Sequence, residues 1–163
     1  MNIFGIVGYK NTGKTGLMER LVTDITARGF TVSTIKHAHH SFDVDHAGKD
    51  SYRHRAAGAS QVLLSSGARW ALMSELRGTQ EPPLADLIGK LDPVDLVLIE
   101  GYKADRHPKL ETFRAITKGT LLASTDPTIL AVATDTDIAV DQPVFDLDDT
   151  AAIADFIIAQ VGL

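Results

Sequence analysis

The sequence has 163 residues, a length typical of one domain and sufficient to bury a core without covalent cross-links. It carries 16 Lys and Arg against 21 Asp and Glu, and the resulting net charge of −5 argues against a general binder of nucleic acid or anionic membranes. There is no cysteine, which excludes disulfides and thiolate metal sites, and no apolar stretch approaches the roughly 20 residues that cross a bilayer, so we expect a cytoplasmic protein.

The first 36 residues predict a strand, a loop, a helix and a second strand. The apolar run Asn2–Val7 is typical of a buried parallel strand. A helix follows, because apolar residues recur at helical spacing, namely Leu17, Met18, Leu21, Val22 and Ile25. Arg28 and Gly29 end that helix, and residues 31–36 predict the second strand. Together these elements form one βαβ unit.

The rest of the chain continues to alternate strands and helices. The middle is predicted to contain a polar loop at 37–49, a helix at 50–58 capped by Asp50 or Ser51, hairpin strands at 61–64 and 69–73, and a helix after Pro82 and Pro83. Buried strands follow at 95–100 and 129–133, and the last helix covers 151–161, capped by Asp148, Asp149 or Thr150. This order predicts an α/β fold in one domain over residues 1–163. Its sheet is mostly parallel with helices on both faces, and the hairpin is a small antiparallel elaboration at the sheet edge.

Residues 8–15, GYKNTGKT, match the phosphate-loop pattern G-x-x-x-x-G-K-[ST] between a predicted strand and a predicted helix. The glycines allow backbone amides to point inward, and the helix N-terminus adds partial positive charge. We therefore expect the phosphates of a nucleotide to be bound by Gly8, Asn11, Thr12, Gly13, Lys14 and Thr15. Lys14 is expected to reach the β- and γ-phosphates, and the Thr15 hydroxyl to ligate Mg²⁺. The alternative is a chance glycine-rich turn.

Glu100 ends the most continuous apolar run of the chain, at the strand edge where ligands gather in open parallel sheets. We expect its carboxylate to hold Mg²⁺ directly or through a water, and so to belong to the catalytic machinery. A solvated carboxylate at the end of a strand is the alternative.

The loop after the second strand is rich in histidine and aspartate. Asp43 and Asp45 are candidate catalytic residues that could hold a metal-bound water or position an attacking water. His37, His39 and His40 are candidates to contact an anion or a second metal. A solvated polar loop would have the same composition, so this alternative stays open.

Asp135 follows the strand 129–133 and is the candidate residue for recognising the base. A carboxylate at such a position accepts hydrogen bonds from N1 and N2 of guanine, whereas adenine has no donor at N1. Asp137 and Asp126 lie nearby, and an ordinary turn aspartate is the other reading.

Taken together, these segments resemble the MobB family of molybdopterin-guanine dinucleotide biosynthesis adaptor proteins. The resemblance covers essentially the whole chain, and its segments are 8–15, 35–59 (IKHAHHSFDVDHAGKDSYRHRAAGA), 69–75 (RWALMSE), 95–103 (DLVLIEGYK) and 131–135 (AVATD). The second segment is long and unusual, so it is far more specific than the phosphate loop.

The resemblance implies a P-loop NTPase fold of the SIMIBI type, a homodimer, and binding of GTP and Mg²⁺ with slow GTP hydrolysis. It also implies molybdopterin cofactor chemistry and a partner, the MobA guanylyltransferase, which joins GMP to molybdopterin. In this sequence the family's site residues match Lys14, Thr15, Asp43, Asp45, Glu100 and Asp135. Many relatives in the wider class have a lysine after the first loop glycine; Tyr9 stands there in this chain, so a lysine acting across a dimer from that position is not expected.

Two other functions, a small-molecule kinase and a scaffold, are less consistent with the sequence. A small-molecule kinase would need an arginine-bearing lid, and the connector 78–83 is short with only Arg77 beside it. A scaffold with a vestigial loop conflicts with the intact pair of Lys14 and Thr15. The basic segment 102–109 could contact the pterin phosphate or a partner, but a solvated loop is slightly favoured.

Overall fold

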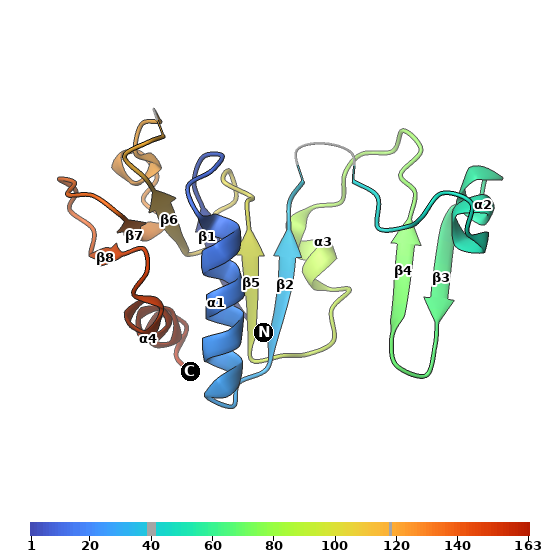
Figure 1. Ribbon diagram of the computed structural model, residues 1–163, viewed down its shortest axis with the longest axis horizontal. Coiled ribbons are helices and arrows are strands. Elements are labelled where there is room, and N and C mark those ends of the chain that lie inside the picture. Colours follow the sequence, from blue (N-terminus) through green and yellow to red (C-terminus); the bar gives the residue numbers. More distant parts are fainter. Residues whose placement is uncertain (39–41, 118) are drawn as a thin grey trace. The chain divides into compact units, whose positions relative to one another are not determined.

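The computed structural model describes residues 1–38, 42–117 and 119–163 (Figure 1). The chain forms two compact units, one made of Met1–His37 with Leu84–Leu163 and the other of Ala38–Pro83. That both units act as a single domain stays a prediction. Within the described ranges, no helix combines the length and the apolar composition needed to cross a membrane.

Over its described residues, the first unit is built on a sheet of six parallel strands in the order β2-β5-β1-β6-β7-β8. These strands are β1 (Asn2–Val7), β2 (Val32–Lys36), β5 (Leu96–Glu100), β6 (Lys109–Phe113), β7 (Ile129–Thr134) and β8 (Val144–Asp146). Because β1 lies between β5 and β6, the loop that follows it leaves the sheet from the centre of its carboxyl edge. The predicted α/β class with a mostly parallel sheet is confirmed.

Helices cover both faces of this sheet (Figure 1). They are α1 (Lys14–Ala27), α3 (Leu84–Ile88) and α4 (Thr150–Val161), with a short 3₁₀ turn η1 (Leu122–Ser124). In β5, Leu96 and Leu98 join the core formed with α1 and α4, whereas Val97 and Ile99 pack with Leu84 of α3. A strand covered on both faces is apolar at successive positions, as Leu96–Ile99 are, which is why the sequence predicted β5 clearly.

The last helix confirms one of its three predicted caps. Asp149 is the N-cap of α4, and its carboxylate accepts a hydrogen bond from the Ala152 amide at 3.0 Å. This bond satisfies one of the backbone donors that every helix leaves unpaired in its first turn.

Strand β6 lies in the middle of the sheet, although the sequence analysis did not predict a strand there. Lys109, Glu111 and Thr112 have no exposed surface at all. The Lys109 ammonium donates hydrogen bonds to the carbonyl oxygens of Lys103 and Asp105 and lies 3.0 Å from the Asp126 carboxylate. The favoured reading of residues 102–109 as a solvated loop is therefore wrong for Lys109.

His107 and Glu111 are also buried in or beside this strand. A Cβ at Gly5 of β1 would overlap the His107 ring, so the histidine packs directly on the central strand. Burial lowers the pKa of His107 and favours its neutral form. Burial also raises the pKa of Glu111, and hydrogen bonds from the amides of Leu122 and Ala123 partly oppose that rise. Glu111 thereby fixes the start of η1.

The second unit contains α2 (Asp50–Ala56) and the antiparallel strands β3 (Gln61–Ser65) and β4 (Trp70–Ser74). The predicted antiparallel hairpin is confirmed, and among the described residues it forms a two-stranded sheet of its own. Its predicted position at the edge of the large sheet stays a prediction. The predicted cap of α2 is wrong, because Lys49 is the N-cap and the Ser51 hydroxyl donates to Asp45 at 2.8 Å.

Candidate nucleotide-binding site

The segment 8–13 folds tightly between β1 and α1, with positive φ at Gly8 (145°), Asn11 (66°) and Gly13 (94°). A Cβ at Gly8 would lie 2.5 Å from the Thr112 carbonyl oxygen of β6. The left-handed backbone and this close approach both require glycine at position 8. The loop therefore has the tight curl that the sequence pattern predicts.

Two buried threonines fix this loop to the sheet. The Thr12 hydroxyl donates to the Tyr9 carbonyl at 2.9 Å and lies 2.7 Å from the Thr112 hydroxyl. The Thr112 hydroxyl in turn donates to the Val7 carbonyl at 3.2 Å. Thr12 is thus a structural support of the loop through its side chain, and only its backbone remains to meet a phosphate.

Lys14 is the first residue of α1, and its ammonium donates to the Tyr9 carbonyl at 2.6 Å. Burial lowers the pKa of Lys14; Glu100 opposes this effect, and the positive charges of Lys103 and Lys36 add to it. A bound phosphate would oppose this lowering of the pKa, because its negative charge stabilises the protonated ammonium.

Thr15 and Glu100 meet beside the loop, as the sequence analysis expected. The Thr15 hydroxyl donates to Glu100 Oε1 at 3.2 Å, and Glu100 is only 9% exposed. Two neighbouring oxygen ligands of an octahedral Mg²⁺ lie about 2.9 Å apart, because each metal–oxygen bond is about 2.05 Å long. The spacing and the oxygen chemistry of this pair therefore fit Mg²⁺.

Lys36, the last residue of β2, contacts the same two oxygens. Its ammonium lies 3.2 Å from Glu100 Oε1 and 3.4 Å from the Thr15 hydroxyl. Binding of Mg²⁺ to the pair would require this exposed lysine side chain to move away, toward the region where a phosphate would carry negative charge. Lys36 is not among the site residues predicted from the sequence, although its position at the end of a strand beside β5 is a signal that could reveal it.

Asp135 follows β7, two strands away from β1 in the sheet. Its carboxylate accepts a hydrogen bond from the Ala115 amide at 3.2 Å, and Oδ2 lies 3.9 Å from Nε of Arg114. About half of the Asp135 side chain stays exposed and accessible to a ligand. The alternative base reader Asp126 precedes β7 and is engaged by Lys109 and Thr128 instead.

A cavity of about 280 Å³ opens beside the phosphate loop. Its lining residues are Asn11, Gly13, Lys14, Thr15, Gly16 and Arg114. All but Arg114 belong to the loop or to the first turn of α1, whose N-terminus favours anions. The helix N-terminus with Lys14 and the Arg114 guanidinium therefore both give the cavity a positive electrostatic potential.

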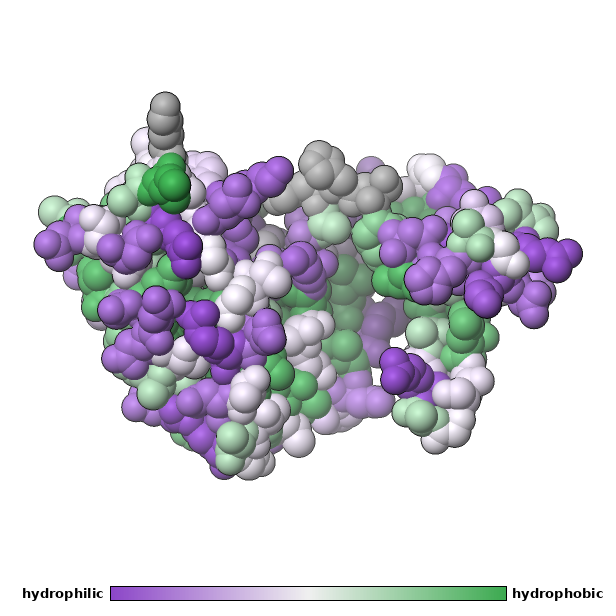
Figure 2. Space-filling view, in the orientation of Figure 1, coloured by the Kyte–Doolittle hydropathy of each residue, from purple (hydrophilic) through white to green (hydrophobic). Residues whose placement is uncertain are grey.

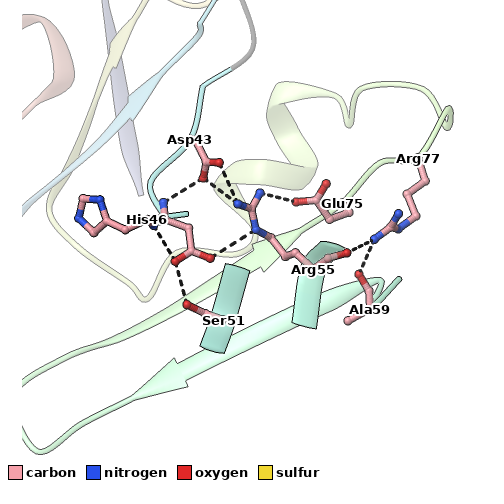
Figure 3. A network of polar contacts seen from close by, with 8 residues as sticks. Asp43, His46, Ser51, Arg55, Ala59, Glu75 and Arg77 are labelled. Atoms are coloured by element: carbon pink, nitrogen blue, oxygen red, sulfur yellow. Dashed lines mark hydrogen bonds and ion pairs between the residues drawn. The ribbon is translucent and has the colours of Figure 1, made fainter. Parts of the chain in front are cut away.

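The candidate acids Asp43 and Asp45 lie in the second unit, where Arg55 of α2 holds both (Figure 3). The guanidinium lies 2.9 Å from the Asp43 carboxylate, 3.5 Å from Asp45 and 3.1 Å from Glu75. Hydrogen bonds from Arg55 lower the pKa of Asp43, and those to Asp43 and Glu75 raise the pKa of Arg55. These contacts organise the second unit, and a catalytic role for Asp43 and Asp45 stays a prediction.

The histidine loop is described only in part. His39 and His40 lie outside the described residues, so their predicted contact with an anion or metal stays a prediction. The His37 ring stacks on Tyr102 with a centroid separation of 4.5 Å. Where the structure describes the chain, no group of three His, Asp or Glu side chains could hold a metal ion.

Comparison with known proteins supports the resemblance seen in the sequence. The profile of the MobB family, described as molybdopterin guanine dinucleotide synthesis protein B, matches residues 3–135. A molybdopterin-guanine dinucleotide biosynthesis adapter protein from Haemophilus influenzae is 42% identical over 159 residues, which cover 95% of this chain and 86% of that protein. The protein of the same name from Escherichia coli is 38% identical over 160 residues, covering 96% and 91% of the two chains.

Solved structures agree with this assignment. The MobB homolog from Bacillus stearothermophilus superposes with a TM-score of 0.71 at 28% identity, covering 99% of both chains. Bacillus subtilis MobB superposes with a TM-score of 0.77 at 24% identity, covering 99% and 98%, which supports the fold alone. From the profile match and the two relatives, the chain belongs to the family of molybdopterin guanine dinucleotide synthesis protein B, MobB.

Proposed function

We propose that this protein is a GTP-binding adaptor in the biosynthesis of molybdopterin guanine dinucleotide, acting in the cytoplasm. One observation carries the proposal: the strand-to-helix loop, Lys14, and the oxygen pair of Thr15 and Glu100 converge on the carboxyl edge of a parallel sheet. The names of the relatives from H. influenzae and E. coli supply the pathway.

In this proposal each part of the site has one task. Backbone amides at the start of α1 and the Lys14 ammonium bind the β- and γ-phosphates. Thr15 and Glu100 would hold Mg²⁺, which supplies charge neutralisation at the phosphate oxygens. Asp135 accepts from guanine and thereby distinguishes GTP from ATP.

Hydrolysis of GTP is expected to be slow in the isolated protein. No residue in the sequence is clearly a water-positioning glutamine or an arginine finger, and such a finger alone supplies on the order of 10³–10⁵ in rate. A partner that completes the site would accelerate turnover. Single-turnover hydrolysis faster than about 1 s⁻¹ without any partner, a typical fully assembled rate, would contradict this part of the proposal.

Titration calorimetry with Mg²⁺ tests the assignment of the base-reading acid. Wild type is expected to bind GTP and to bind ATP much more weakly. Asp135→Asn should reduce the preference for GTP by at least about tenfold, because the variant replaces one acceptor by a donor facing guanine N1. Asp137→Asn, an exposed neighbour two residues along, is the control and should retain the preference. Equal affinity of wild type for both nucleotides would remove Asp135 from this role.

The proposed partner is a MobA-like guanylyltransferase, with its molybdopterin cofactor. Co-purification of tagged protein with this enzyme, with and without GTP, tests the adaptor role directly. Wild type should retain the enzyme when GTP is present, and Lys14→Ala should retain less, because the proposed contact depends on bound GTP. No retention under any condition would argue against this partner.

We also propose a homodimer, and the hairpin of the second unit supports it. Its exposed apolar side chains are Leu63 (61%), Leu64 (40%), Trp70 (61%) and Leu72 (46%), and Figure 2 shows apolar surface among polar atoms in this part of the chain. An isolated two-stranded sheet is marginally stable, so a second copy would supply the missing cover.

Sedimentation at micromolar concentration should therefore give the mass of a dimer. The double variant Trp70→Ser, Leu72→Ser should raise the dissociation constant of the dimer by at least about tenfold, because two apolar side chains no longer contribute to the interface. Ile116→Ser is the matched control, since Ile116 is 83% exposed but lies outside the hairpin. A wild-type monomer would disprove the dimer.

A further inference from the structure

Among the described residues that line the cavity beside the phosphate loop, Arg114 alone does not come from the loop or from α1. It follows β6 directly, and β6 is the neighbour of β1 in the sheet. The chain therefore brings its guanidinium to the carboxyl edge of the sheet, alongside the phosphate loop.

The guanidinium packs directly against the loop. A Cβ at Gly13 would lie 3.4 Å from both Nε and Nη2 of Arg114. Nε itself is buried and has no hydrogen-bond partner among the described residues. About 40% of the side chain remains exposed, and Arg114 lines the cavity. A donor group held in this way is prepared to bind an anion.

The order of strands sets which part of a nucleotide lies over Arg114. Glu100 ends β5, the loop follows β1, Arg114 follows β6 and Asp135 follows β7, and these strands are consecutive in the sheet. Neighbouring strands lie about 4.8 Å apart, so Arg114 stands between the phosphate end and the base end of the site. The anionic group of a nucleotide that lies between the terminal phosphates and the base is the α-phosphate.

The nearby carboxylate does not prevent this contact. Arg114 Nε and Asp135 Oδ2 are 3.9 Å apart, beyond hydrogen-bond distance, and both side chains are about half exposed. Such a pair is weak, so a phosphate can take the guanidinium while a guanine takes the carboxylate. One ligand would then satisfy both residues at once.

We infer that Arg114 binds the α-phosphate of the guanine nucleotide, a role that rests on the proposed function. Its contribution is then the same for GTP, GDP and GMP, because all three carry this phosphate. Lys14, by contrast, contributes only where a β-phosphate is present.

Displacement of a fluorescent GDP analogue by GTP, GDP and GMP tests the inference. This assay measures dissociation constants even in the millimolar range. Arg114→Gln should weaken all three ligands by a similar factor of roughly 10 to 100, the effect of losing a charge-assisted bidentate contact. Arg114→Lys keeps the charge but loses the fork, and should lie between wild type and Arg114→Gln. Lys14→Ala should weaken GTP and GDP while GMP keeps its affinity.

Arg106→Gln is the matched control, because Arg106 is exposed and its substitution removes the same charge as Arg114→Gln. Thermal unfolding monitors whether each variant is folded. If Arg114→Gln behaves like Arg106→Gln, or weakens GTP but not GMP, the inference is overturned while the proposed function stands. If wild type binds none of the three ligands, the proposed function fails and the inference with it.

Discussion

Lys14→Ala is expected to weaken GTP binding by about 100-fold or more. The ammonium is half-buried and, without a ligand, donates to the Tyr9 carbonyl at 2.6 Å. In the proposed complex it makes charge-assisted hydrogen bonds to phosphate oxygens, and losing them costs about 3 kcal/mol. Titration calorimetry with Mg²⁺ measures the change, and circular dichroism reports whether the fold is intact.

Lys10→Ala is the control for this variant, because Lys10 is an exposed lysine of the same loop. It should change the affinity by only a few fold through the general loss of charge. Unchanged GTP affinity in Lys14→Ala would mean that the triphosphate does not lie in this loop.

The lowered pKa of Lys14 adds a pH dependence to the same experiment. Because burial lowers this pKa below 10.5 in the free protein and a phosphate would raise it, GTP binding takes up a proton as the pH approaches the lowered value. Affinity should therefore fall with rising pH before pH 10.5 is reached. The affinity of Lys14→Ala should lack this fall with pH, which distinguishes the titration of Lys14 from titrations elsewhere in the molecule.

The sequence predicted the phosphate loop and its flanking elements because those signals are local. The spacing from Gly8 to Thr15 is a property of eight consecutive residues, and the apolar run ending at Glu100 marks a strand covered on both faces. Parallel strands share one carboxyl edge, so the meeting of Thr15 and Glu100 followed from strand ends alone.

Strand β6 could not be predicted in this way, because its burial depends on distant partners. Its residues KLETF contain a lysine and a glutamate, which in most sequences indicate an exposed segment. Here Lys109 is paired with Asp126, and Glu111 accepts from the amides of Leu122 and Ala123. Each partner lies 11 to 17 residues after the side chain that it pairs with, and no periodicity in the strand reveals it.

The missed strand explains the missed site residue. Without β6, the sequence offered no reason to place Arg114 beside the phosphate loop. The network around Arg55 was equally hidden, because an arginine on a short helix gives no sign of gathering Asp43, Asp45 and Glu75. Pairing between charged side chains is set by the tertiary fold, and short patterns in sequence do not encode it.

Lys109→Ala is expected to destabilise the first unit by about 3–5 kcal/mol, the typical cost of removing one partner from a buried ion pair. The substitution leaves the carbonyls of Lys103 and Asp105 without their donor and the Asp126 carboxylate without its cation. It also leaves a cavity where the fully buried side-chain stem packed. Urea unfolding followed by circular dichroism measures the loss, and the exposed Lys90→Ala should stay within about 0.5 kcal/mol of wild type.

Measuring the free energy of unfolding at low pH separates the contribution of the ion pair from that of the cavity. Burial alone would raise the pKa of Asp126, but hydrogen bonds from Thr128 and Lys109 outweigh it and bring the pKa below its ordinary value of 3.8. The stability contributed by the ionised carboxylate is therefore fully present above pH 3.8 and is lost as the pH falls through the lowered pKa. The difference in stability between wild type and Lys109→Ala should be constant above that pH and become smaller below it. What remains in acid is the effect of the cavity and of the lost hydrogen bonds to the carbonyls of Lys103 and Asp105. A difference that does not change in acid would mean that the pair contributes nothing, and that packing and the two carbonyl hydrogen bonds keep a lysine inside the central sheet.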